Sequence, residues 1–334
     1  MYQKKLNLFG LILNKLTMSK LAIKKYVGNI MSVNKLLTSL TLCCMALCST
    51  HAVSAVESTW YGSFNTGVRF NSTPITQSKD LEVYNDQGSF IGLDAYSGYD
   101  TFYVRGRLEV DMNGSTLGGN LTTKQSFVEL GQNGGFYRIG SIMSLVTQIM
   151  VQPNNIMHSQ RSMEHIAFNH SESAAPYKSN VFQMQFPYEQ NLMTYFEFEM
   201  DAEDGDELFN DYTAGIGIVS DEGSITYMTF KDNINNEKYW AIALDYRSAQ
   251  SKYAITYSKG EGVNTWDTAL SYQSNTLITK SSLHVLDLPD LVEANLMLGM
   301  DFLIGEQGVA YFEYSRLFDQ QGAYDLSAGI RIDF

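Results

Sequence analysis

Polar and apolar residues alternate along several stretches of this chain, and the C-terminal stretch shows the pattern most clearly. Every second residue there is apolar, and the residues between are polar or glycine. The apolar set comprises Leu326, Ala328, Ile330, Ile332 and Phe334. Because successive side chains of a strand point to opposite faces, the alternation predicts a strand with one oily face and one wet face.

The same two-residue period recurs in earlier stretches. They include Trp60 to Phe70, Phe102 to Asp111, Phe196 to Glu199 and Trp240 to Arg247. After residue 55 no stretch approaches the run of about 18 apolar residues that a membrane-spanning helix requires. A soluble sandwich and a membrane barrel would both contain such strands, with the oily face turned to a core in the first and to lipid in the second.

Strand length and aromatic placement favour the barrel. The alternating stretches run about ten residues, enough to cross a bilayer when tilted, whereas sandwich strands average nearer six. Aromatic residues such as Trp60, Trp240 and Trp266 lie near the ends of the stretches, as an interfacial girdle requires.

The connections predict the number of strands, because short turns alternate with longer polar segments. Short turns fall near 98–100, 132–135, 187–190, 221–223, 248–251, 274–276 and 305–307. Longer segments fall near 71–88, 113–123, 142–175, 202–209, 232–237, 260–264, 286–291 and 317–323. Together they predict an all-β fold in which residues 56–334 form one transmembrane antiparallel β-barrel of about sixteen strands.

The N-terminal region predicts export. An apolar run over Leu36–Leu47 follows Lys35 and leads to Val53-Ser54-Ala55, which carries small residues where a signal peptidase reads. The run is too short to span a membrane. We therefore expect residues 1–55 to be a signal peptide cleaved after Ala55, and residues 1–30 could be an upstream extension. All three cysteines lie in this region, so the exported chain would contain no disulfide.

The charge distribution excludes one class of partner. The whole chain carries a formal charge of -13, and every acidic residue lies after residue 55. Nucleic-acid binding needs a basic face, so we expect no nucleic-acid partner.

Several short pieces, in this order and spacing, resemble the general porin family of Gram-negative outer membranes. They are Trp60–Gly62, Ser89–Leu93, Ser126–Gly131, Gly135–Gly140 and Ile330–Phe334. The resemblance implies an outer-membrane homotrimer in contact with lipid and lipopolysaccharide. It also implies that the long loop after the fifth strand, residues 142–175, folds inward, and that Ile330, Ile332 and Phe334 form a signal for the outer-membrane assembly machinery.

A porin constriction needs basic residues on one wall and acidic residues facing them, so that hydrated polar solutes and ions pass. We expect the constriction to draw on residues of the lumen face and of the long loop. The candidates are Arg69, Arg105, Arg107, Glu109, Arg138, Arg161 and Glu164. The alternative is that the arginines pair with wall acids and only satisfy the polar interior.

The alternation places ten acids on the inferred lumen face: Glu109, Asp111, Glu197, Glu199, Asp245, Asp267, Asp301, Glu313, Asp325 and Asp333. The arginines that it places there are Arg69, Arg105, Arg107, Arg138, Arg247 and Arg331. Because the acids outnumber the arginines, we predict passive diffusion of small hydrophilic solutes with a mild cation preference.

Two rival functions remain open. A substrate-selective channel would carry aromatic rows, and the inferred lumen face holds Tyr61, Tyr103, Tyr195 and Tyr311. A barrel hydrolase would need a nucleophile and a base, for which only His284 with Ser281 or Ser282 lies on a strand.

The long loop also contains histidines, which are common metal ligands. His158, Glu164, His165 and His170 match no regular zinc spacing. The sequence therefore predicts no enzyme activity, no cofactor and no metal.

Overall fold

The computed structural model describes most of the chain after residue 55. The described residues are 56–73, 78–84, 89–99, 101–112, 122–159, 177–189, 191–200, 211–232, 237–260, 262–318 and 323–334. Residues 1–55 lie outside these ranges, so the signal peptide stays a prediction. No helix among the described residues is long and apolar enough to cross a membrane.

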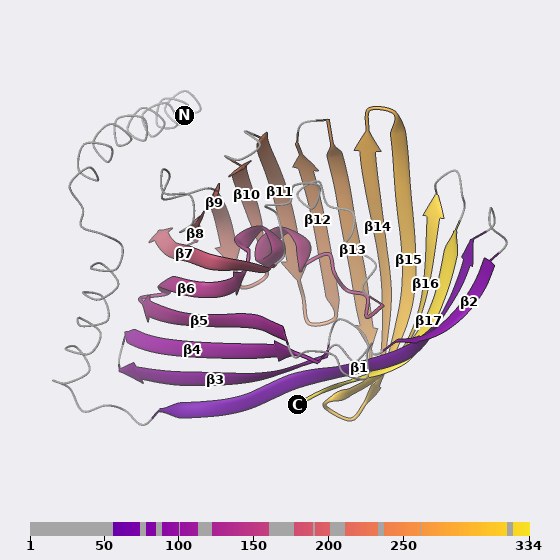
Figure 1. Cartoon of the computed structure of the whole chain (residues 1–334), viewed down its shortest axis with the longest axis horizontal. Coiled ribbons are helices and arrows are strands. Elements are labelled where there is room, and N and C mark those ends of the chain that lie inside the picture. Colours follow the sequence, from indigo (N-terminus) through magenta and orange to yellow (C-terminus); the bar gives the residue numbers. More distant parts are fainter. Residues whose placement is uncertain are drawn as a thin grey trace. The chain divides into compact units, whose positions relative to one another are not determined.

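The described chain is almost entirely strand (Figure 1). The strands are β1 (Glu57–Thr73), β2 (Ser78–Tyr84), β3 (Phe90–Tyr99), β4 (Phe102–Asp111), β5 (Thr122–Gln132), β6 (Gly135–Met143), β7 (Tyr177–Glu189), β8 (Leu192–Glu199), β9 (Asp211–Ser220), β10 (Gly223–Asp232), β11 (Glu237–Arg247), β12 (Ser251–Lys259), β13 (Asn264–Ser274), β14 (Leu277–Leu288), β15 (Leu291–Ile304), β16 (Gly308–Phe318) and β17 (Tyr324–Asp333). One short π-helix, η1 (Thr147–Val151), follows β6.

The strands form a closed antiparallel barrel of sixteen. From β3 onward each strand pairs with the next, and β17 pairs with β1 to close the ring. Both β2 and β3 pair antiparallel with β1, β2 with its residues 67–73 and β3 with its residues 57–63. They therefore occupy one strand position beside β1, with β2 ending at Tyr84 and β3 beginning at Phe90, and the predicted number of strands is confirmed.

The two faces of the sheet are those of a membrane barrel. On β13, Thr265 and Asp267 are fully buried, whereas Trp266 between them is 51% exposed. On β17, Asp325 and Ser327 are buried, whereas Ile330 is 47% exposed. A sandwich would bury the apolar face, so the polar interior decides between the two architectures that the alternation left open.

Two predicted connections differ from the structure. Residues 71–88 contain the end of β1 and all of β2, because the alternation continues through Leu81 and Val83, both exposed apolar residues. The expected long segment 286–291 shrinks to the turn at Pro289 and Asp290, since β14 runs to Leu288 and β15 begins at Leu291. Polar residues predict longer connections at these two points, whereas the strands extend into them.

Phe334 lies at the end of the barrel seam, the pairing of β1 with β17 that closes the ring. Its backbone exchanges two hydrogen bonds with Gly62, at 2.8 and 3.1 Å, just beyond the β1–β17 ladder. Its ring lies over Gly62, where a Cβ would come 2.7 Å from the ring carbon Cζ.

We expect Phe334→Ala to lower the yield of assembled barrel, because it exposes this end of the seam. The measurement is the heat-modifiable band in outer-membrane fractions, with Phe318→Ala, another exposed aromatic, as the control. Equal yields for the two variants would contradict a specific role for Phe334.

Candidate functional site

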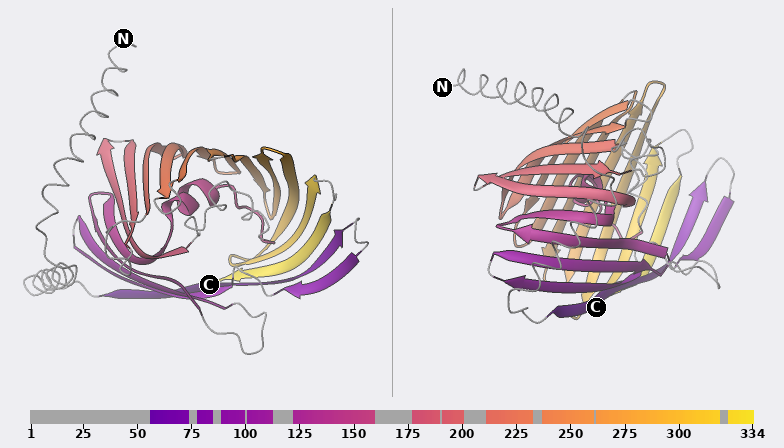
Figure 2. Two further views of the ribbon diagram at one scale, coloured as in Figure 1. Left: turned by 45° about the horizontal axis from the view of Figure 1, so that its top comes forward. Right: turned by 60° about the vertical axis from the view of Figure 1, so that its left-hand side comes forward.

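The chain after β6 runs along the inner face of the barrel (Figure 2). At its start the backbone N–H of Leu145 donates to Glu197 on β8 over 2.6 Å. Further on, the Asn154 amide donates to the Thr256 hydroxyl on β12 over 2.7 Å. Residues 144–159, called here the inner segment, thus contact both β8 and β12. The rest of the predicted loop, with Arg161 and Glu164, lies outside the described residues.

The first half of the inner segment covers an apolar part of the wall. Leu145, Val146, Met150 and Val151 are buried against inward-facing side chains of β8, β10 and β11. The wall residues are Tyr195, Met228, Phe230, Tyr239, Ala241 and Ala243. Apolar burial of this kind stabilises a position by roughly 25 cal/mol per Å² removed from water, so this half is held by packing.

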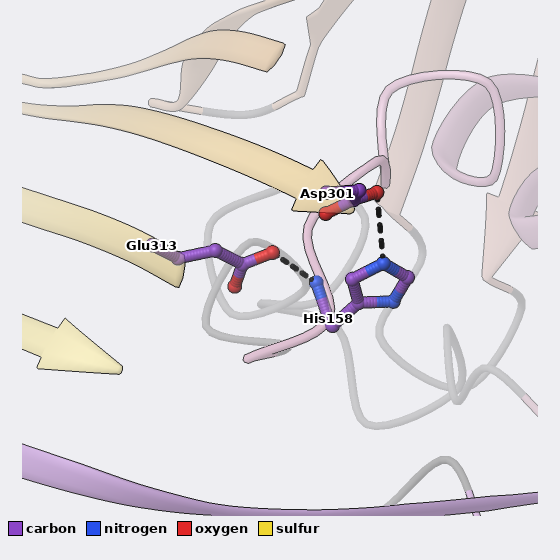
Figure 3. A group of neighbouring side chains, drawn as sticks. All are labelled: His158, Asp301 and Glu313. Carbon is purple, nitrogen blue, oxygen red and sulfur yellow. Dashed lines mark hydrogen bonds and ion pairs between the residues drawn. The ribbon is translucent and has the colours of Figure 1, made fainter. Parts of the chain in front are cut away.

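The far end of the inner segment is held by charge (Figure 3). The Glu313 carboxylate accepts backbone N–H bonds from His158 and Ser159, over 2.6 and 2.7 Å. The His158 ring lies 3.1 Å from Asp301. Lys280 lies between both acids, 2.7 Å from Asp301 and 2.9 Å from Glu313.

The ligand atoms of His158, Asp301 and Glu313 lie within 4.8 Å of one another, which a metal ion could use. The Lys280 ammonium already supplies the cation to both carboxylates, however, so this group is an ion-pair anchor. His158 is the one member of the considered histidine cluster that the structure describes. Glu164, His165 and His170 lie outside the described residues.

Arg69 joins the same anchor. Its guanidinium donates to the Ser159 carbonyl over 2.7 Å and pairs with Glu82 at 3.0 Å. Asn65 donates to the His158 carbonyl over 3.1 Å. Of the predicted basic wall, Arg69 therefore binds the inner segment.

Arg105 and Arg107 share one carboxylate. The guanidiniums of Arg105 and Arg107 both form ion pairs with the Asp94 carboxylate on β3. Arg107 Nη2 lies 2.7 Å from Asp94 Oδ2. Arg107 also lies 3.7 Å from Glu109 and 5.1 Å from the centre of the Tyr61 ring.

Arg138 is buried more deeply than this pair. It bonds Glu129 at 2.5 Å and lies about 4.5 Å from the rings of Phe127 and Phe136. All four described arginines of the predicted basic wall face inward, and each contacts a carboxylate. The sequence analysis did not single out Asp94 and Glu129 as partners of these arginines. The strand register identifies both, since Asp94 lies opposite Arg107 on β4 and Glu129 lies opposite Arg138 on β6.

A recess of about 440 Å³ opens on this wall. It lies beside the short-turn ends of β3 and β4 and the start of β1, and no residue of the inner segment lines it. Its lining consists of Glu57, Thr59, Tyr61, Asp94, Tyr96, Tyr103, Arg105 and Arg107.

The residues considered for hydrolysis are partly assembled. His284 bonds Asp267 through Nδ1, and both side chains are buried. Ser282 faces the same side of β14, yet its hydroxyl has no hydrogen-bond partner among the described residues. A catalytic serine must lie within hydrogen-bond reach of its base. The described contacts pair His284 with Asp267, as a base with its orienting acid, but they do not join Ser282 to His284.

Comparisons with solved structures find the same fold. An anion-selective porin from Comamonas acidovorans matches with a TM-score of 0.71 at 13% identity, over 84% of this chain and 100% of that chain. OmpT expressed in the outer membrane of Vibrio cholerae matches with a TM-score of 0.64 at 10% identity, over 85% and 99%. A triple mutant of Rhodopseudomonas blastica porin matches with a TM-score of 0.62 at 10% identity, over 84% and 100%. No family model and no curated protein sequence matches the chain.

Proposed function

We propose that residues 56–334 form a water-filled channel in the outer membrane of a Gram-negative bacterium, through which small hydrophilic solutes and ions diffuse passively. The observation that carries the proposal is the polar, charged inner face with a segment of the chain lying along it. Interior charges are costly unless they serve a path for water and ions. The shared fold with structures named as porins supports the same function.

The proposed assembly is a homotrimer embedded in lipid and lipopolysaccharide and inserted by the outer-membrane assembly machinery. One of the matching Vibrio cholerae OmpT structures is named as a trimer form. The exposed apolar outer face supplies the surface that lipid or a neighbouring copy would cover.

Single-channel recording of the refolded protein in planar bilayers tests the function. We expect stable current steps in KCl, grouped in threes for a trimer. A folded, heat-modifiable protein that gives no steps would overturn the channel.

We further propose a mild preference for cations. The described inner face adds Asp94, Glu129 and Asp211 to the predicted acids and Lys124, Lys178, Lys252 and Lys280 to the predicted bases, so carboxylates still exceed cations. Screening over about 8 Å at physiological salt keeps such a preference small. It also makes the preference weaken as salt rises.

The arginine pair at Asp94 provides the test of selectivity. Replacing both Arg105 and Arg107 by alanine leaves Asp94 without its partners, so we expect the permeability ratio of potassium to chloride to rise about twofold or more. The measurement is the reversal potential across a KCl gradient, with Arg247→Ala, an exposed inward arginine, as the control. An anion-favouring wild type would contradict the preference.

A further inference from the structure

Two tyrosines of the recess lie flat against the wall because glycines of the neighbouring strand make room for them. A Cβ at Gly92 would come 2.5 Å from Tyr61 Cζ, and a Cβ at Gly131 would come 2.0 Å from two ring carbons of Tyr103. Any other residue at these glycines would lift the rings. Each ring therefore packs one face on the wall, and the Arg107 guanidinium lies 5.1 Å from the centre of the Tyr61 ring.

Hydrogen bonds fix both rings in that position. Tyr61 Oη donates to Glu109 over 2.7 Å, and Tyr103 Oη donates to Glu129 over 2.8 Å. A third ring, Tyr96, lies 5.5 Å from Tyr103 between ring centres, with the planes 29° apart. Tyr96 is 43% exposed. The three rings line the same recess and are called here the aromatic platform, in which Tyr61 and Tyr103 are fixed and Tyr96 is the most accessible ring.

Charged groups at the edge of the platform are balanced. The recess is lined by the guanidiniums of Arg105 and Arg107 and by the carboxylates of Asp94 and Glu57. The Asp94 pairing holds the two guanidiniums in place, and their side chains remain 30% and 25% exposed. The lining therefore offers fixed donors and acceptors without net charge.

From this arrangement we infer that the recess is a binding subsite for neutral sugars. The faces of a pyranose ring carry C–H groups that pack on aromatic rings, and its hydroxyls bond planar charged groups at the ring edge. A volume of about 440 Å³ suits a small ligand. An anion would gain little, because the two cations of the lining are matched by two acids.

The inference rests on the proposed channel and names a solute class for it. The recess lies at the short-turn end of the lumen, on the wall that the described inner segment leaves uncovered. A diffusing sugar would meet it along the path. Its occupation would slow the sugar there and lower the ion current while the site is filled.

Ion-current titration with maltose tests the subsite, with the open-chain polyol mannitol as the control for viscosity. We expect a saturable fall of current with maltose and only a linear fall with mannitol. Tyr96→Leu keeps apolar volume but removes the ring, so its half-saturating maltose concentration should rise about tenfold. Tyr96→Phe keeps the ring and should stay within about threefold of wild type.

Tyr253→Leu, on the outer face of β12, is the matched control and should leave the titration unchanged. A normal KCl conductance without saturable maltose block would overturn the subsite while leaving the channel intact. So would a Tyr96→Leu variant indistinguishable from wild type, or saturation by benzoate in place of maltose. If no current appears, calorimetric titration of the refolded protein with maltose still tests the subsite independently of the channel.

Discussion

Glu313→Ala should detach the end of the inner segment from the barrel wall and produce a larger, noisier single-channel current. The carboxylate accepts two backbone N–H bonds, from His158 and Ser159, and pairs with Lys280. Removing it leaves all three donors without this acceptor in a buried site. Breaking a buried ion pair costs on the order of 3–5 kcal/mol. The described contacts left to hold this end are the His158 ring with Asp301 and the bonds from Asn65 and Arg69.

The increase in conductance should be about twofold, because a detached segment no longer occupies the lumen beside β15 and β16. Glu313→Gln should give a smaller increase, since the amide oxygen still accepts a backbone N–H bond while the ion pair is lost. Glu306→Ala, in the exposed β15–β16 turn, is the control for loss of one carboxylate. Unchanged conductance in a folded Glu313→Ala barrel would show that the anchor does not hold the segment.

The anchor also shows where sequence reasoning stopped. Alternation alone placed Asp301 and Glu313 on the inner face, because facing depends only on the two-residue period within a strand. Their partner His158 lies 143 and 155 positions away in the chain. A local sequence pattern cannot predict contacts between residues so far apart in the chain, because such contacts depend on the path of a loop across the lumen.

Charge pairing within the wall was more accessible from the sequence. Arg105 and Arg107 were placed inward correctly, but Asp94 was not named among the lumen acids, although it lies in the predicted strand between the connections 71–88 and 98–100. Asp94 lies two residues after Gly92, so the two-residue period places both on the inner face, with Asp94 opposite Arg107. The neighbour could be deduced only once the strand register was known, and register is set by turns and bulges.

A single methyl group is expected to have a large effect at Gly140, on β6 just before the inner segment. This residue has φ +144, a conformation that L side chains rarely adopt. A Cβ there would come 2.1 Å from the Ser126 carbonyl oxygen and 2.8 Å from Phe127 Cα. Both atoms belong to the backbone of β5, so neither can move without breaking the ladder.

Gly140 also precedes an irregularity, because the β6–β7 register shifts between Gly140 and Ile142. The shift sets the direction in which the chain leaves the wall toward Leu145. We therefore expect Gly140→Ala to lose most of the folded barrel, since backbone strain of about 1–3 kcal/mol adds to the steric clash with β5.

Gly106→Ala provides the matched control for Gly140→Ala, because it adds the same methyl group to a strand of the same barrel. A Cβ at Gly106 meets nothing within 4 Å, and its φ lies outside the left-handed range. Its yield of heat-modifiable protein and its denaturant midpoint should therefore match wild type, or exceed it slightly because alanine reduces the freedom of the unfolded chain. A Gly140→Ala barrel that folds as well as Gly106→Ala would show that β5 and β6 can separate at this point. The bulge would then not fix the entry of the inner segment.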